Sequence, residues 1–116
     1  MSLETALDHT LMALADPTRR AILQRLTQGE ARVTELARPF DMSLNAVSKH
    51  IQVLERAQLV KRRKVGREHF LAANPEPLDA AAAWIEKQRA FWSHRLDLLE
   101  RELKALDAKR DQRRRK

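Results

Sequence analysis

The sequence predicts a mainly α-helical fold with a small β-hairpin and a long C-terminal helix. Helix breakers are sparse, with only two glycines and four prolines in 116 residues. Apolar residues recur at spacings of three and four through most of the chain, which is typical of amphipathic helices. Residues 59–72 instead carry β-branched and aromatic residues on both sides of a single glycine, which indicates strand, turn and strand.

The first two predicted helices meet at Asp16-Pro17. Leucines at positions 3, 7, 11 and 14 have the spacing of one helix face. Asp16 is placed to cap the second helix and Pro17 to open it, because proline suits the first helical position. That helix is expected to reach about Gln28, where Gly29 ends it. Its inward residues are expected to be Ala21, Ile22, Leu23 and Leu26.

A short helix from Val33 to about Arg38 must stop at Pro39, because proline clashes with a further helical turn. Ser43 is then placed to cap a longer helix that runs to about Ala57. The inward residues of this longer helix are expected to be Leu44, Val47, Ile51 and Leu54. A short helix, a tight turn and a longer helix predict a helix-turn-helix, and the hairpin that follows would be its wing.

The last helix begins near residues 74–77, and its apolar seam continues to residue 108. Residues 78–108 would span about 46 Å at roughly 1.5 Å per residue, which is longer than one domain of this size can cover. We therefore expect a homodimer joined along this helix and the first one, rather than a helix folded back on its own domain. The predicted interface residues are Leu7, Leu11, Ile85, Trp92, Leu96, Leu99 and Leu103.

The formal charge of +7 implies an anionic partner, and the charge is unevenly placed. Residues 49–67 hold seven Lys and Arg against one Glu, interleaved with apolar residues that would fix them in position. Residues 109–116 hold six basic residues, one acidic residue and no apolar one, so we expect a basic, disordered tail after a domain of residues 1–108. Specific recognition is expected in the first of these two segments.

The predicted longer helix has a second face suited to reading DNA. With Val47, Ile51 and Leu54 inward, the opposite face carries side chains that donate or accept hydrogen bonds. The first turns of a recognition helix meet base edges in the major groove, and a basic wing suits the phosphate backbone. Double-stranded DNA is therefore the predicted partner. The residues on this face are Asn45, Ser48, Lys49, Gln52 and Arg56.

Three segments stand out by their order and spacing: residues 14–23 (LADPTRRAIL), 34–37 (TELA) and 47–60 (VSKHIQVLERAQLV). They resemble successive signatures of the ArsR family of winged-helix repressors, over about residues 5–105. The resemblance implies a homodimeric transcriptional repressor on an imperfect palindrome, with residues 43–56 as recognition helix and 62–67 as wing. It also implies DNA contacts at Ser48, Lys49 and His50.

The helix face, the hairpin and the resemblance together define the predicted DNA interface. Its members are polar or cationic residues of the helix-turn-helix and the wing. They are Thr34, Ser43, Asn45, Ser48, Lys49, His50, Gln52, Arg56, Arg62, Lys64 and Arg67.

No metal or other cofactor is expected. The chain has no cysteine, and residues 35–40 read ELARPF where the soft-metal sensors of the family carry their thiolates. His94 and Asp97 would make only half of a zinc-type site, with no second pair on the last helix. Phe91-Trp92 followed by Leu96 and Leu99 instead resembles the metal-free branch that includes the SdpR autorepressor.

Other function classes are disfavoured. No catalytic triad order, glycine-rich phosphate loop or paired carboxylates occur, so no enzyme is expected. No apolar run reaches the roughly 20 residues of a membrane span and no signal peptide precedes the first helix, so we expect a cytoplasmic protein. Two alternatives remain, a nonspecific nucleoid-type DNA binder and an interaction module that uses the last helix. An effector, either a small molecule or a protein, also stays open.

Overall fold

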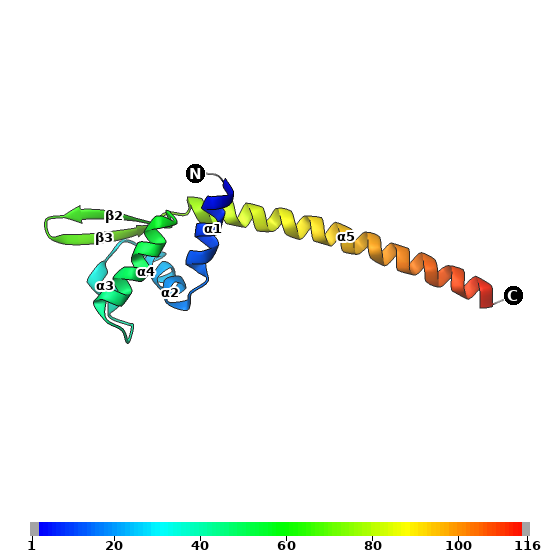
Figure 1. Cartoon of the computed structure of the whole chain (residues 1–116), viewed down its shortest axis with the longest axis horizontal. Helices are drawn as coiled ribbons and strands as arrows, with labels where there is room; N and C mark the ends of the chain where they lie inside the picture. The colour runs from blue at the N-terminus through cyan, green and yellow to red at the C-terminus, as the bar shows by residue number, and fades with distance from the viewer. Residues whose placement is uncertain (1–2, 115–116) are drawn as a thin grey trace. The chain divides into compact units, whose positions relative to one another are not determined.

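The computed structural model describes residues 3–114 and confirms a mainly helical chain with a small antiparallel sheet (Figure 1). The chain forms two compact units, Met1–Ala81 and Ala82–Lys116. The elements are α1 (Leu3–Leu14), α2 (Pro17–Leu26), β1 (Ala31–Arg32), α3 (Val33–Ala37), α4 (Leu44–Arg56), β2 (Val60–Val65), β3 (Glu68–Ala73) and α5 (Glu76–Arg114).

The junction between α1 and α2 follows the expected capping chemistry. The side chain of Asp16 accepts a hydrogen bond from the backbone N–H of Arg19 (3.0 Å), which satisfies one unpaired donor of the first turn of α2. Pro17 occupies the start of the helix. After α2 the chain turns at Gly29, whose φ of +126° suits a residue without a Cβ. Ala21 was expected inward but is exposed, because Ile22, Leu23 and Leu26 already make the inner face.

The helix-turn-helix consists of α3, the turn at residues 38–43 and α4. The hydroxyl oxygen of Ser43 accepts from the backbone N–H of Ala46 (3.1 Å), as the sequence predicts for the cap. Val47, Ile51 and Leu54 are fully buried and form the inner face of α4. The prediction for Leu44 is wrong, since half of its surface is exposed. The core meets α4 only from Val47 onward and does not reach the first turn.

The end of α4 turns the chain into the hairpin. Gln58 has a φ of +61°, and the N–H of Leu59 donates to the carbonyl of Leu54 (3.0 Å), a bond that closes the helix. The amide side chain of Asn74 donates to the carbonyl of Gln58 (2.7 Å). The backbone N–H of Asn74 donates to the carbonyl of Leu59 (2.8 Å), so the two ends of the hairpin are held together.

The sheet has three strands in the order β1-β3-β2, all antiparallel, where the sequence predicted only two. The hairpin pairs Val60 with Ala73 and Val65 with Glu68, and turns at Gly66 (φ +63°) and Arg67. The extra strand β1 pairs with β3 over two residues only, which is too short for an alternating pattern to be visible in the sequence.

One continuous core joins every element of the first unit except the start of α5. It is built by small and branched apolar side chains that meet between the helices and the inner face of the sheet. Its buried members are Ala13, Ile22, Leu23, Leu26, Ala31, Leu36, Val47, Ile51, Leu54, Ala57, Leu59, Val60 and Leu71.

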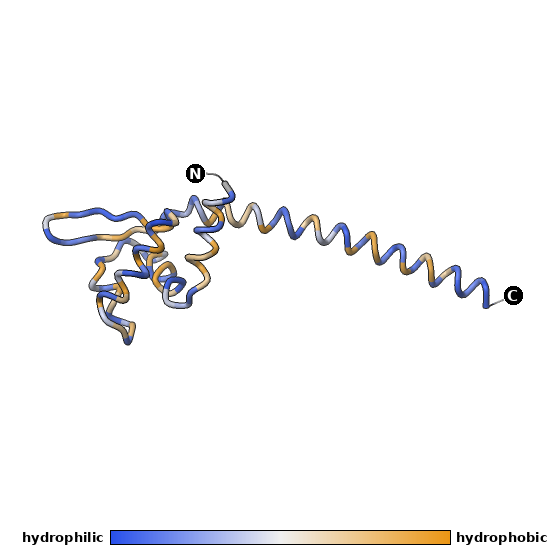
Figure 2. Tube along the Cα trace, viewed as in Figure 1, coloured by the Kyte–Doolittle hydropathy of each residue, from blue (hydrophilic) through white to orange (hydrophobic). Residues whose placement is uncertain are grey.

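Helix α5 continues beyond the expected end at residue 108 and remains helical to Arg114. The residues from 109 onward include Lys, Arg and Gln, which are good helix formers, and cations near a helix C-terminus complement its dipole. The expected disordered tail is therefore helical at residues 109–114, and positions 115–116 lie outside the described residues. Apolar positions recur along α5 between polar ones (Figure 2).

The unequal burial of α4 predicts unequal effects of truncation. Ile51→Ala should lower the free energy of unfolding by about 2–5 kcal/mol, because it opens a cavity in the core. Leu44→Ala should change it by less than about 1 kcal/mol, since Leu44 is half exposed. Urea denaturation of both variants at one protein concentration measures the difference. Similar losses in the two variants would contradict the described packing.

Candidate nucleic-acid interface

The outward face of α4 is polar along its whole length. Asn45, Lys49, Gln52 and Arg56 are exposed, and Ser48 is half-buried beside them. They lie opposite the buried apolar face of the same helix, so the core determines which way they point. The structure thus brings together the five residues that the sequence placed on this face. Amide and hydroxyl groups of this kind can bond to base edges, and Lys and Arg can bond to phosphates.

The hairpin adds exposed cations next to α4. Strand β2 and the turn carry Lys61, Lys64 and Arg67, all exposed. None of these three makes an ion pair with any residue in the range 3–114. Lys49 and Arg56 of α4 are unpaired in the same sense. Five of the seven cations in residues 49–67 are therefore available to an external anion.

Arg62 differs from the other wing cations. Its Nε and Nη2 donate to the two carboxylate oxygens of Glu55 on α4, at 3.2 and 2.7 Å. Both side chains are about 30% exposed, so the two-bond contact lies in a partly buried position. The sequence predicted Arg62 as a DNA contact, but here its guanidinium ties β2 to α4. Such paired geometry is the strongest form of an arginine–carboxylate contact.

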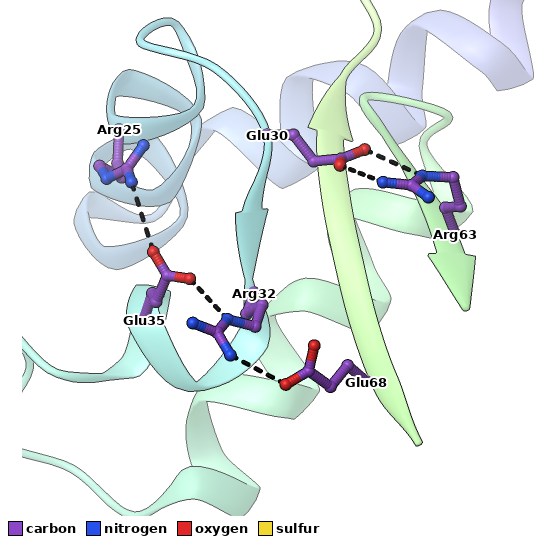
Figure 3. Close-up of polar contacts among 6 residues, drawn as sticks. All are labelled: Arg25, Glu30, Arg32, Glu35, Arg63 and Glu68. Atoms are coloured by element: carbon purple, nitrogen blue, oxygen red, sulfur yellow. Dashed lines mark hydrogen bonds and ion pairs between the residues drawn. The ribbon is translucent and has the colours of Figure 1, made fainter. Parts of the chain in front are cut away.

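Arg63 is also engaged within the protein. Its guanidinium binds the carboxylate of Glu30, with Nε donating at 3.3 Å, as Figure 3 shows. The hydrogen bond from Arg63 lowers the pKa of Glu30. The same guanidinium lies over the ring of Phe70, 5.0 Å from its centroid, which is within the range of a cation–π contact. Its charge is thus compensated within the protein.

A second group of charges links the helices to the sheet (Figure 3). Arg32 donates to Glu35 and to Glu68, each at 2.8 Å, and Arg25 lies 3.9 Å from Glu35. The hydrogen bond from Arg32 is the main reason that the pKa of Glu35 lies below its ordinary value. All four side chains are exposed or half-buried, so these pairs orient surface groups and add little stability. Arg25, Arg32, Glu35 and Glu68 therefore neutralise one another within the fold.

His50 joins α4 to the α1–α2 junction. Nη1 of Arg19 donates to Nδ1 of His50 (3.2 Å), and the carboxylate of Asp16 lies 3.8 Å from the same nitrogen. Because a guanidinium has no acceptor, Nδ1 must accept, and a neutral His50 then carries its proton on Nε2. The backbone N–H of Arg19 is the main cause of the lowered pKa of Asp16.

The same arginine also closes α1. Nε and Nη2 of Arg19 donate to the carbonyls of Ala13 and Met12, at 2.8 and 2.9 Å. Arg20 donates to the carbonyl of Leu14 (2.8 Å). These bonds satisfy carbonyls that a helix C-terminus leaves unpaired. The segment at residues 14–23 that stood out in the sequence is therefore a structural junction, and Arg19 connects it to α4 through His50.

Thr34 and Ser43 complete the predicted interface at the helix-turn-helix. Thr34 is exposed on α3, and Ser43 is exposed immediately before α4. The oxygen of Ser43 serves as the α4 cap, so its hydroxyl can still donate to an outside acceptor. Neither position makes a contact that would prevent binding from outside.

The long helix presents a row of exposed apolar side chains. Among the predicted interface residues Trp92 and Leu96 are each 61% exposed, and Ile85, Leu99, Leu103 and Leu11 are exposed as well. Leu7 is half-buried. Monomeric soluble proteins rarely expose large contiguous apolar patches, so a row of this length is typical of an interaction surface. Further exposed members of the row are Leu78, Trp84, Phe91, Leu98 and Leu106.

Two features of the interface were missed from the sequence. Lys61 was not among the predicted contacts, although it is exposed and makes no ion pair within residues 3–114. Leu44 and Met42 are exposed beside the polar face of α4. Helical spacing assigned Leu44 to the core, and no signal in the sequence shows how far the core extends.

No cluster of three or more potential metal ligands occurs within residues 3–114. Among the same residues, no helix is both long enough and apolar enough for a membrane span.

Comparison with known proteins bears on these features. Residues 14–63 match the family described as a helix-turn-helix domain. An HTH-type transcriptional regulator of Mycobacterium tuberculosis, Rv2034, is 40% identical over 96 residues, which cover 83% of this chain and 87% of the relative. The transcriptional repressor SdpR of Bacillus subtilis is 27% identical over 79 residues, covering 68% and 88% of the two chains.

Two solved structures have the same fold. A crystal structure of an ArsR family transcriptional regulator shares 44% identity at a TM-score of 0.75, covering 78% of this chain and 93% of that one. A solution structure from Mycobacterium bovis, described as a homodimeric winged helix-turn-helix DNA-binding domain, shares 29% identity at a TM-score of 0.61, covering 79% and 83%. The helices, the wing and these similarities agree, and the chain belongs to the ArsR family of winged helix-turn-helix transcriptional regulators.

Proposed function

We propose that this protein is a homodimeric repressor that binds a palindromic operator through α4 and the β2–β3 wing. The observation that carries the proposal is the division of α4 into a fully buried apolar face and an exposed polar face, with unpaired cations on α4 and the neighbouring hairpin. A helix held in this way presents fixed hydrogen-bonding groups to a major groove. The unpaired cations supply the attraction to phosphates that every DNA-binding protein needs.

The interface residues divide into two roles in this proposal. Asn45, Ser48 and Gln52 read base edges, because their side chains carry both donors and acceptors. The phosphate anchors are Lys49, Arg56, Lys61, Lys64 and Arg67. Thr34 and Ser43, which lie in the helix-turn-helix before the polar face of α4, donate hydrogen bonds to the DNA phosphate backbone.

His50 and Arg62 have separate places in the proposal. His50 donates from Nε2 to a phosphate, since its Nδ1 already accepts from Arg19. Arg62 acts as a positioning residue that holds the wing at α4 through Glu55.

The exposed apolar row on α5 supports assembly into a dimer, and the M. bovis relative of similar fold is described as homodimeric. Two copies would pair these rows, with Leu7 and Leu11 of α1 contributing, and would present two recognition helices. A two-fold dimer matches a two-fold operator, with half-sites about 10 base pairs apart or a multiple of that distance. The protein would act in the cytoplasm with the DNA that it binds, without a catalytic role.

Sequence discrimination is the property that separates this proposal from a nonspecific nucleoid-type binder. Fluorescence anisotropy compares binding to a fragment of the protein's own promoter with binding to a scrambled duplex at one salt concentration. The promoter fragment should bind at least about 1000-fold more tightly, as specific sites do. Equal affinity for the two duplexes would overturn the repressor function and support the nonspecific alternative.

Gln52→Ala and Asn45→Ala should weaken specific binding by about 1–3 kcal/mol each, because a side chain that pairs with a base is lost. Binding to the scrambled duplex should change little. Anisotropy titrations on both duplexes measure the two effects. Equal losses on the two duplexes would show that these residues do not read bases.

Arg67→Ala and Arg62→Ala should differ in their salt dependence. Loss of an unpaired anchor such as Arg67 should flatten the slope of log K against log salt by about 0.9 for each phosphate contact removed. Arg62→Ala should leave that slope unchanged, since its charge is already compensated by Glu55. Titrations of both variants at several salt concentrations measure the slopes. A flattened slope in Arg62→Ala would restore this residue to the phosphate contacts.

Leu99→Asp should convert the dimer to a monomer and abolish binding to a palindromic duplex, because a carboxylate would be buried in the apolar seam. Arg101→Asp on the opposite side of α5 is the matched control and should remain dimeric. Light scattering coupled to size exclusion measures the mass of each. A wild-type protein that is monomeric at micromolar concentration would contradict the dimer and favour an interaction module.

A further inference from the structure

The start of the recognition helix carries an apolar side chain that the proposed hydrogen-bonding roles leave unused. Leu44 is the first residue of α4 and is 50% exposed, whereas Val47, Ile51 and Leu54 on the same helix are 0% exposed. Met42, two residues earlier, is also exposed. Scattered exposed leucines are common on protein surfaces, so exposure alone does not assign a role. The position of Leu44 is what distinguishes it.

Leu44 is adjacent to the proposed base-reading face. Ser48, four residues further along α4, lies on the same side of the helix as Leu44, whereas the side chain of the next residue, Asn45, points about 100° away around the axis. The first turn of a recognition helix is the part that approaches base edges most closely. The unpaired Lys49, one turn after Asn45, adds attraction for the DNA backbone at the same end of α4. Leu44 is therefore continuous with the surface proposed to enter the major groove.

The major groove offers one apolar group to such a side chain. Among the four bases, only thymine displays a methyl group there, at C5, while the other exposed positions are mainly hydrogen-bond donors and acceptors. We propose that Leu44 is a specificity-determining residue that packs against the C5-methyl of a thymine in each operator half-site. Leu44 has no hydrogen-bonding group in its side chain, so its selectivity comes from apolar contact. This inference rests on the proposed function.

Replacing thymine with uracil tests the contact, because it removes the methyl and preserves every hydrogen-bonding group of the base. The operator is first mapped by footprinting on the promoter fragment, and each thymine of a half-site is then replaced by uracil in separate duplexes. At one thymine position, a single uracil in one half-site should weaken binding of the wild-type protein about fourfold, the value expected for one buried methyl-sized group.

Leu44→Ala should bind the thymine and uracil duplexes with equal affinity, because the partner of the methyl is gone. Leu44→Met keeps an apolar side chain of similar size and is the matched control, so it should retain most of the preference for thymine. Circular dichroism melting of the variants checks that they fold. If a variant does not fold, the uracil series with the wild-type protein still tests the contact.

Two results would overturn the inference. The first is a wild-type protein indifferent to every uracil replacement, and the second is a Leu44→Ala variant that keeps the full wild-type preference for thymine. Either result is distinct from a failure of the proposed function, in which the wild-type protein would not prefer the operator to a scrambled duplex at all.

Discussion

The burial of one face of α4 is the constraint on which the rest of the structure depends. Val47, Ile51 and Leu54 are inaccessible to solvent and meet side chains from α1, α2, α3 and the sheet. Their packing fixes the rotation of the helix about its axis, and with it the direction of the polar residues on the opposite face. The direction of the residues proposed to contact DNA is therefore set by apolar packing on the opposite face of α4.

Ion pairs divide the cations of residues 49–67 into paired and unpaired ones. Arg62 and Arg63 lie in the most basic segment of the chain, yet both are held by carboxylates from elsewhere in the fold. The Arg63–Glu30 pair is largely exposed and the Arg62–Glu55 pair is partly buried, and both connect the hairpin to other parts of the fold. The five unpaired cations of residues 49–67 lie on α4 and on the hairpin. A surface with fewer free charges depends more on base contacts and less on general phosphate attraction.

Much of this architecture could be predicted from the sequence, because its signals are local. Proline and capping residues at 16–17 and 43 defined the helix starts, and the three-four spacing found the buried face of α4. Three features could not be predicted, since each depends on tertiary contacts. Strand β1 exists only through pairing with β3, the exposure of Leu44 reflects where the core ends, and the role of Arg62 depends on Glu55. Residues 109–114 are helical although their charge favoured a disordered tail, because Lys, Arg and Gln are good helix formers.

The most direct test of the central claim is selection of bound duplexes from a random DNA pool by the full chain. A dimer with two fixed recognition helices predicts an enriched motif made of two inverted half-sites, their centres about 10 base pairs or a multiple of that apart. Binding to the selected duplex should occur at two chains per site. An enriched motif without two-fold symmetry, or a pool that remains random after repeated selection, would contradict the account.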